Sequence, residues 1–410
     1  MQIKDLVTLS IHDIAFGGDG VGRMPDGRAI FVPFTAIGDR IQAKVTAVQP
    51  RMAKAELTQI LEAGPDRVEP ACPLYGRCGG CRYQHIKAAA QIGLKQAQLT
   101  AVLRRIGGLR ELPAVEKVVS SPLPYGYRNK FKLQAFRPIR GGAPAYGFCA
   151  LDNKTMLEIS TCPLAAPAVN AAAKEALASP DAARNAGREE LLDLTVRATA
   201  SGRSYWYFGI PPKNMAWAQE ELLGKPVQVP PGGFWQINSS VSSLLVQEVV
   251  AWFQNSPTPQ FIDAYAGVGP FCLAIGNKAA SHVLIELDRE AIEAADRNTA
   301  AWGIKGVEIL PGKAEARLPS LLRQLGPQAK EATILLDPPR TGADPRLLAS
   351  LRGSAVAQAI YVSCNPATLA RDLKQLCGEG EMPPFKVVRL AAFDMFPQTP
   401  HLESVVLLQR

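Results

Sequence analysis

Three side chains that could carry covalent chemistry lie beside apolar, β-branched segments in the C-terminal third of the chain. Cys364 and Asp337 each follow such a segment, and Glu403 precedes one. Segments of this composition are typical of buried strands. A thiolate can act as a nucleophile and a carboxylate as a general base, so the combination predicts a covalent catalyst. Glu403 alone would be typical of an exposed surface position.

The surroundings of Cys364 favour a reactive thiol. The dipeptide Asn365–Pro366 follows it, and a helix is expected to begin near Ala367. Backbone N–H groups at a helix start lower the pKa of a thiol. The alternative is a buried cysteine that acts as a small inert hydrophobe. We interpret Cys272 and Cys377 in that way, because they fall within apolar helical patterns.

A glycine turn and two acidic residues indicate a nucleotide-like ligand. Asp263 ends an apolar segment that leads into Gly267–Gly269, and Glu286 ends the next such segment. A carboxylate at that place can bind ribose hydroxyls, and adenosyl ligands fit this kind of site. The third glycine of the dinucleotide fingerprint is missing and Pro270 interrupts it, so a purely structural turn is the alternative. The prolines after Asp337 fix a rigid turn that aims its carboxylate into the same cleft.

Four cysteines outside this region form a possible metal site. Three are bunched, and the fourth is distant and followed by a proline: Cys72, Cys78, Cys81 and Cys162. Four thiolates suit either tetrahedral zinc or an iron–sulfur cluster. The dense triplet with intervening glycines favours a 4Fe–4S cluster over zinc. A redox-active Cys-x-x-Cys pair at Cys78 and Cys81 is a weaker third interpretation.

Charge and length narrow the class of protein. The chain has 410 residues and a formal net charge of +8. Between residues 81 and 140 there are twelve Lys or Arg against two acids. Such a stretch suits a polyanion, although a solvated surface would have the same composition. The first residues contain no signal-peptide core and no segment is apolar enough to span a membrane, so we expect a cytoplasmic protein.

The periodicity predicts three kinds of structure along the chain. The pattern up to about residue 60 predicts short strands of a small barrel, and the glycine-rich segment 17–22 is interpreted as a turn. A helix over 84–106 and a mixture of strands and one helix up to about 209 predict an α+β middle domain. Residues 226–233 indicate a proline- and glycine-rich boundary. From 239 onward, strands and helices alternate, which predicts a doubly wound parallel sheet.

Three longer segments surround the reactive residues: Phe234–Asn238, Ser363–Asp372 and Asp394–Ser404. Together they resemble the motifs of S-adenosylmethionine-dependent RNA uracil-5-methyltransferases. The resemblance covers essentially the whole chain and is strongest to the iron–sulfur-containing 23S ribosomal RNA (uracil-5-)-methyltransferases. The segment Ser363–Asp372 is the most specific of the three.

This resemblance implies a role for each candidate residue. Cys364 would be the nucleophile and Glu403 the general base. Pro270 departs from the pattern, and the segment Tyr125–Lys130 resembles one near the RNA, so their contacts stay open. The expected cofactor-binding residues are Gln236, Tyr265, Glu286 and Asp337, and the expected 4Fe–4S ligands are Cys72, Cys78, Cys81 and Cys162.

The resemblance also implies an architecture. Residues 1–62 would form an RNA-binding, OB-like TRAM β-barrel, and residues 63–232 an α+β central domain with the iron–sulfur site. Residues 233–410 would form a Rossmann-like methyltransferase domain, on which residues 86–118 could pack. The expected molecule is a monomer with RNA as its partner and no membrane association.

The expected activity is methylation of C5 of a uridine in 23S ribosomal RNA, through a covalent adduct between cysteine and C6 of the uracil. Two alternatives remain at this point. One is methylation of a uridine in the T-loop of transfer RNA. The other is a non-catalytic RNA-binding assembly factor that retains the cofactor fold.

Overall fold

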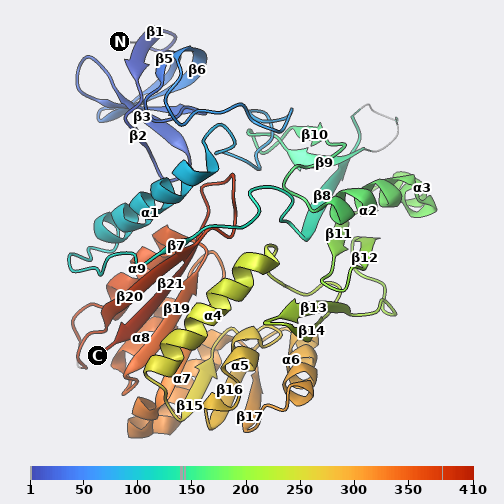
Figure 1. The fold of residues 1–410 in the computed structure, drawn as a ribbon, viewed down its shortest axis with the longest axis vertical. Helices are drawn as coiled ribbons and strands as arrows, with labels where there is room; N and C mark the ends of the chain where they lie inside the picture. The colour runs from blue at the N-terminus through green and yellow to red at the C-terminus, as the bar shows by residue number, and fades with distance from the viewer. Residues whose placement is uncertain (1, 139–141, 143–144, 381) are drawn as a thin grey trace.

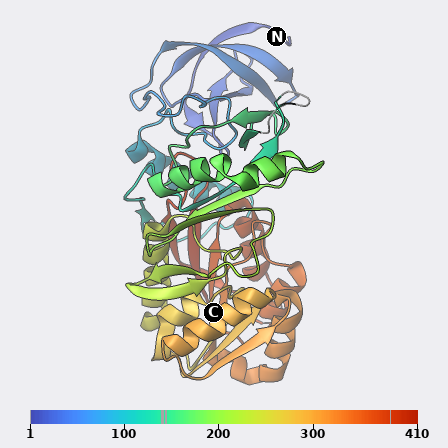
Figure 2. The ribbon, with the colours of Figure 1, turned by 90° about the vertical axis from the view of Figure 1, so that its right-hand side faces the viewer.

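The computed structural model describes residues 2–138, 142, 145–380 and 382–410. The molecule is elongated (Figure 2). A small β-structure lies at the N-terminal end and a large sheet with helices at the other, joined by a helix and a second sheet (Figure 1). Among the described residues, no helix is both long and apolar enough to cross a membrane.

The N-terminal strands form one sheet in the order β1-β5-β6-β4-β3-β2, curled around a shared apolar core (Figure 1). This confirms the expected N-terminal β-structure. The strands are β1 (Leu6–Ser10), β2 (Asp13–Ile14), β3 (Asp19–Arg23), β4 (Ala29–Pro33), β5 (Arg40–Val48) and β6 (Met52–Glu62).

The glycine segment 17–22 is partly a strand, so its interpretation as turn chemistry alone was wrong. From Asp19 onward the segment forms β3, which pairs with β4. A Cβ atom at Gly20 would lie 1.9 Å from Thr35 Oγ1, and one at Gly22 would lie 2.2 Å from Leu9 Cδ1. Glycine is needed in this strand because neighbouring parts of the barrel approach its backbone closely.

The middle of the chain contains α1 (Ala88–Arg105) and an antiparallel sheet in the order β10-β9-β8-β11-β12. The helix α2 (Pro167–Ala178) packs on this sheet through an alanine-rich face, and α3 (Pro180–Ala186) follows it. The strands are β8 (Lys130–Phe136), β9 (Ala145–Cys149), β10 (Met156–Glu158), β11 (Leu194–Ala198) and β12 (Ser204–Phe208).

The first part of the segment 226–233, where we expected a boundary, belongs to a strand. β13 (Ala218–Leu222) and β14 (Lys225–Val229) form a separate two-stranded sheet. Pro226 is tolerated in β14 because this strand pairs with β13 alone among the described strands, and proline is confined to such edge positions.

The C-terminal sheet has the order β17-β16-β15-β18-β19-β21-β20-β7. It confirms the expected alternation of strands and helices but is mixed rather than fully parallel, since β21 runs antiparallel to both β19 and β20. The strands are β7 (Val118–Val119), β15 (Gln260–Asp263), β16 (Ser281–Glu286), β17 (Val307–Pro311), β18 (Ala332–Leu336), β19 (Gln358–Ser363), β20 (Lys386–Phe393) and β21 (Glu403–Gln409).

Helices cover both faces of this sheet and bury two large apolar cores. One core contains residues of α4, α5 and α6, and the other contains residues of α7, α8, α9 and the preceding helix α1. Leu99 and Leu103 are the α1 residues that join the second core. The helices are α4 (Ser239–Asn255), α5 (Pro270–Ile275), α6 (Arg289–Ala301), α7 (Ala314–Leu325), α8 (Pro345–Gly353) and α9 (Pro366–Leu376), with short 3-10 helices at Gly276–Lys278 and Gly326–Glu331.

Candidate active site

The reactive groups singled out from the sequence lie along one edge of the C-terminal sheet. Asp263 and Glu286 end the neighbouring parallel strands β15 and β16. Asp337 follows β18 and Cys364 follows β19, which also pair in parallel. Carboxyl ends of parallel strands share one edge, which explains why strand ends in the sequence locate this site.

The antiparallel strand β21 brings Glu403 to the same edge. Its residue Ser404 pairs with Ser363 of β19. Glu403 therefore precedes, and Cys364 follows, the same paired position. A parallel strand in this place would have put the carboxylate at the opposite edge of the sheet.

The thiol of Cys364 is half-buried at the start of α9. Asn365 caps this helix by accepting the Ala367 N–H at 3.1 Å. Burial and the negative charge of Glu403 together raise the pKa of Cys364 to about 11, although Arg340 acts in the opposite direction. We expected the helix start to lower this pKa, but the cost of burying a thiolate is the larger effect.

The turn after Asp337 is fixed against the helix that follows Cys364. The Arg340 carbonyl accepts hydrogen bonds from Asn365 Nδ2 at 3.1 Å and from Thr368 Oγ1 at 3.3 Å. These bonds keep the guanidinium of Arg340 close to the thiol, where it can stabilise a thiolate.

Burial disfavours the ionised forms of three carboxyl groups at this edge, and the charge of Asp337 adds to this effect at the other two. Burial raises the pKa of Asp337 to about 7, and burial together with the charges of Asp337 and Glu286 raises that of Asp263 to about 8. Burial and Asp337 also raise the pKa of Glu403 well above its usual range. One oxygen of Asp263 is buried without a hydrogen-bond partner in the described structure. Such a group favours a bound cation.

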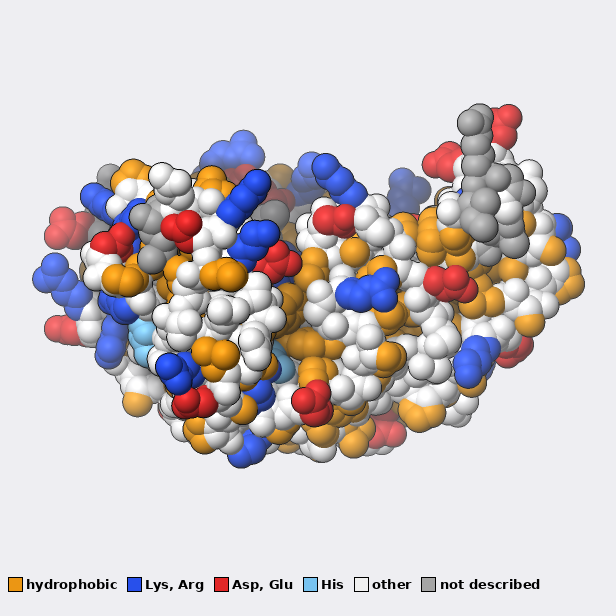
Figure 3. Space-filling model, turned by 90° about the horizontal axis from the view of Figure 1, so that it is seen from above, with side chains coloured by type: hydrophobic (Ala, Val, Ile, Leu, Met, Phe, Trp, Pro, Cys, Tyr) orange, Lys and Arg blue, Asp and Glu red, His pale blue; other side chains and the backbone are white. Residues whose placement is uncertain are grey.

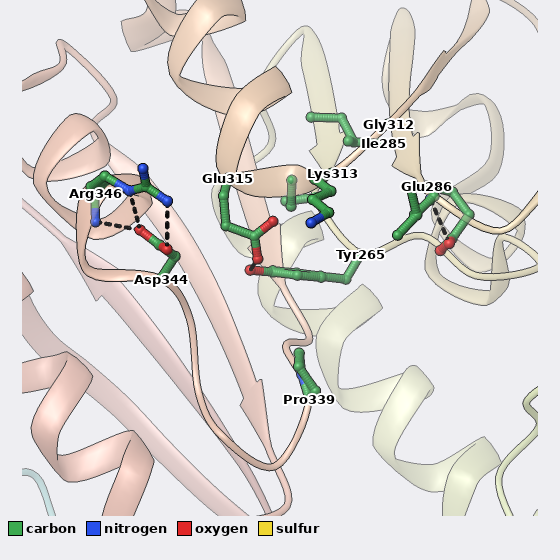
Figure 4. A pocket seen from close by; sticks show the side chains of 12 residues that line it. Tyr265, Ile285, Glu286, Gly312, Lys313, Glu315, Pro339, Asp344 and Arg346 are labelled. Carbon is green, nitrogen blue, oxygen red and sulfur yellow. Dashed lines mark hydrogen bonds and ion pairs between the residues drawn. The ribbon is translucent and has the colours of Figure 1, made fainter.

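A cavity of about 390 Å³ opens beside these groups and is lined in part by Tyr265 and Glu286 (Figure 4). The Glu286 carboxylate accepts three backbone N–H bonds, from Gly267 at 2.8 Å, Leu287 at 2.6 Å and Asp288 at 2.8 Å. It is thereby held in one orientation at the cavity wall.

A narrower hollow of about 60 Å³ adjoins the first, since Tyr265 lines both. Gln236 and Asp337 contribute to its wall, as does Pro270, the first residue of α5. The structure thus brings together Gln236, Tyr265, Glu286 and Asp337, the residues expected to bind a cofactor.

Several residues that line these cavities were not identified from the sequence. Lys313 and Glu315 follow β17, which pairs in parallel with β16, and the Tyr265 hydroxyl donates to Glu315 at 3.4 Å (Figure 4). The strand-end rule that located the other acids would have indicated them. Phe234, which is 70% exposed, lines the narrower hollow; it begins the segment Phe234–Asn238, but the sequence assigned it no role.

The four cysteines expected to bind a metal are half-buried free thiols. Burial raises the pKa of Cys78, and the nearby Cys162 and Cys72 raise it further. Burial likewise raises the pKa of Cys81 to about 12. In the part of the chain that the structure describes, no set of three or more such ligands is close enough to hold a metal ion as it stands.

The basic stretch between residues 81 and 140 does not form one continuous patch. Lys95 is fully buried, and Lys117 and Lys132 pair with Glu248 and Asp193. Arg140 lies outside the described residues. On the face shown in Figure 3, Lys and Arg side chains are scattered among acidic ones.

Comparisons with known proteins agree with this geometry. The model of the tRNA (Uracil-5-)-methyltransferase family matches residues 227–410, and that of the TRAM domain matches residues 5–58. An uncharacterized RNA methyltransferase of Gloeobacter violaceus is 31% identical over 98% of this chain and 96% of its own length. The 23S rRNA (uracil(1939)-C(5))-methyltransferase RlmD of Chromohalobacter salexigens is 30% identical over 98% of this chain and 89% of its own length.

One solved structure shares the fold over the whole length. It is a Pyrococcus abyssi tRNA (uracil-54, C5)-methyltransferase in complex with S-adenosyl-L-homocysteine, with a TM-score of 0.71 and 24% identity, covering 98% of this chain and 99% of that one. The fold, the site and these relatives thus define an RNA methyltransferase. The chain belongs to the RNA uracil-5-methyltransferase family and carries an N-terminal TRAM domain.

Proposed function

We propose that this enzyme methylates C5 of a uridine in 23S ribosomal RNA through a covalent bond between Cys364 and C6 of the uracil. The observation that carries the proposal is the placement of Cys364 and Glu403 beside one paired position of β19 and β21. C5 of uracil is a poor nucleophile, so its methylation needs a nucleophile for C6 and a base for the C5 proton.

Each step follows from one of these residues. Cys364 releases its proton to solvent and its thiolate adds to C6, while the C5–C6 π electrons move to form an enolate that makes C5 nucleophilic. When bound, S-adenosylmethionine would supply the methyl group to C5 and leave as S-adenosylhomocysteine. Glu403 then removes the C5 proton, the C5–H electron pair re-forms the C5–C6 double bond, and the C6–S bond breaks to return the thiolate. Arg340 stabilises the thiolate at both ends of this sequence.

The two adjoining cavities suggest how the cofactor lies. Glu286 would accept ribose hydroxyls in the larger cavity, with Tyr265 between the two spaces. The narrower hollow beside Asp337 and Gln236 would hold the positively charged sulfonium end. That orientation places a cation against the carboxyl groups whose pKa values are raised, and it points toward Cys364.

The 23S rRNA is favoured as substrate by the full-length relative from Chromohalobacter salexigens, whose name specifies uracil 1939 of that RNA. A tRNA uridine is the second candidate, because the structural neighbour from Pyrococcus abyssi acts on uracil 54 of tRNA. In either RNA the target base must leave its stack, at a cost of a few kcal/mol that is lowest in a loop.

Methyl incorporation from labelled S-adenosylmethionine distinguishes these substrates. We expect label in a 23S rRNA fragment and none in tRNA transcripts under the same conditions. Incorporation into tRNA alone would reverse the assignment. A Cys364→Ala variant should incorporate no label into either RNA, whereas Cys377→Ala, which removes a half-buried cysteine that packs beside the core, serves as the matched control.

We also propose that Cys72, Cys78, Cys81 and Cys162 hold a 4Fe–4S cluster. Arg128 supports this, because its Nε is buried without a hydrogen-bond partner in the described structure, and Cys162 and Cys81 lie near its side chain together with Tyr127. A cluster bound by four thiolates is anionic and would neutralise this guanidinium. The thiols must come closer together than they are in this structure to bind it.

A further inference from the structure

The helix α1 carries three buried polar side chains on one face. Gln91, Lys95 and Gln98 are separated by four and three residues, so they lie on consecutive turns of the same face. Their exposed fractions are only 1%, 0% and 6%. Long polar side chains are rarely buried so completely unless they pair with specific partners.

Lys95 and Gln91 bind the loop that leads to Glu403. The Lys95 ammonium contacts Asp394 Oδ1 at 2.5 Å and donates to the Phe396 carbonyl at 3.1 Å. The Gln91 amide exchanges two hydrogen bonds with Gln398, at 2.9 Å and 3.1 Å. Figure 1 shows this loop reaching up beside α1.

These contacts act close to Glu403 along the backbone. Glu403 pairs with Phe393 across β20 and β21, and Asp394 is the next residue after Phe393. Gln398 adopts a left-handed backbone conformation with φ of 68°, which a non-glycine residue keeps only when its surroundings hold it. The Thr399 hydroxyl donates to the Phe396 carbonyl within the loop, and the contacts with α1 fix the loop from outside.

We infer that Lys95 and Gln91 are positioning residues that hold the 394–402 loop so that Glu403 meets the C5 proton. This inference rests on the proposed function of Glu403 as the base that resolves the covalent adduct. Cys364 is carried by α9 and β19, which have other supports. Loss of the α1 contacts should therefore slow the release of the adduct more than its formation.

The test compares single-turnover formation and release of the covalent protein–RNA adduct. Lys95→Met leaves the Asp394 carboxylate buried without a cation and could unfold the protein. The double variant Lys95→Met/Asp394→Asn, which removes both charges, is therefore measured beside it. Gln91→Ala is the third variant. We expect all variants that fold to release the adduct about 10- to 100-fold more slowly, the effect of a small misplacement of a catalytic group. Adduct formation should stay within about threefold of the wild-type rate, because the thiol is supported elsewhere.

Gln98→Leu is the matched control, since Gln98 donates to the Ile14 and Ala15 carbonyls of the barrel rather than to the loop. Its adduct should be released at the wild-type rate. Equal slowing of formation and release in Gln91→Ala and the double variant, or no slowing in either, would overturn the inference. Glu403→Gln is measured in parallel. If it traps no adduct, the proposed mechanism fails. If it traps the adduct while Gln91→Ala and the double variant release theirs at the wild-type rate, only the role of Lys95 and Gln91 is refuted.

Discussion

At the scale of single residues, the site is defined by buried acidic groups whose ionisation is unfavourable without a ligand. Asp263, Asp337 and Glu403 are carboxyl groups in a buried edge, and each has a raised pKa. The neighbouring thiol of Cys364 is also held in its neutral form by burial. A positively charged cofactor would relieve all four, so we expect binding of S-adenosylmethionine to prepare the site electrostatically for thiolate attack.

The affinity for S-adenosylmethionine should therefore rise with pH. In the free enzyme, Asp337 and Asp263 keep their protons up to pKa values of about 7 and 8. A bound sulfonium favours the ionised carboxylates, so binding releases protons and tightens as pH rises from 6 to 8. Calorimetry in two buffers of different ionisation enthalpy measures both effects.

Asp337→Asn should weaken binding and reduce the number of protons released. Asp296→Asn, at an exposed position of α6, should change neither. Binding that is independent of pH between 6 and 8 would show that the cofactor does not meet these carboxyl groups.

At the scale of elements, strand ends were predictable because apolar β-branched segments ending in polar residues mark the carboxyl edge of a sheet. This located Asp337, Glu286 and Cys364. The direction of β21 was not predictable, because a strand looks the same in either orientation, yet it decides where Glu403 lies. The burial of Lys95 was missed for a similar reason, since its partner is Asp394, about 300 residues further along the chain.

The glycines of β3 allow a stability prediction. Gly20→Ala places a Cβ against the buried Thr35, and overpacking of this kind costs about 1–3 kcal/mol. Gly93→Ala in α1 meets no atom within 4 Å and should stabilise the protein by about 0.5–1 kcal/mol, because alanine is the better helix former. Urea unfolding measures both, and a neutral Gly20→Ala would contradict the close approach seen in the barrel.

At the scale of the whole molecule, α1 connects the two ends. Gln98 forms a hydrogen bond with the N-terminal barrel, and Lys95 and Gln91 bind the 394–402 loop. Leu99 and Leu103 pack into a core of the C-terminal sheet. Segments that the sequence presents as separate domains thus share contacts with one helix. The charge pattern could not distinguish surface cations from buried ones, since Lys95 in the basic stretch lies in the interior against Asp394.

The proposed cluster also belongs to this scale, because its ligands come from segments on either side of α1. Protein purified without oxygen should contain about four iron atoms and four acid-labile sulfides per chain, and Cys81→Ser should lose both. Cys149→Ser, at a half-buried thiol outside the ligand set, should retain them. A colourless protein that contains zinc would overturn the assignment.

The most direct test of the central claim is to trap the covalent intermediate with Glu403→Gln. Incubated with S-adenosylmethionine and a 23S rRNA fragment, this variant should accumulate a methylated protein–RNA adduct that survives denaturation and disappears in Cys364→Ala/Glu403→Gln. Its yield should approach one per active site, because the thiolate and methyl-transfer steps do not use Glu403. If Glu403→Gln turns over at the wild-type rate, or traps no adduct while retaining cofactor and RNA binding, the assignment of Cys364 and Glu403 is wrong.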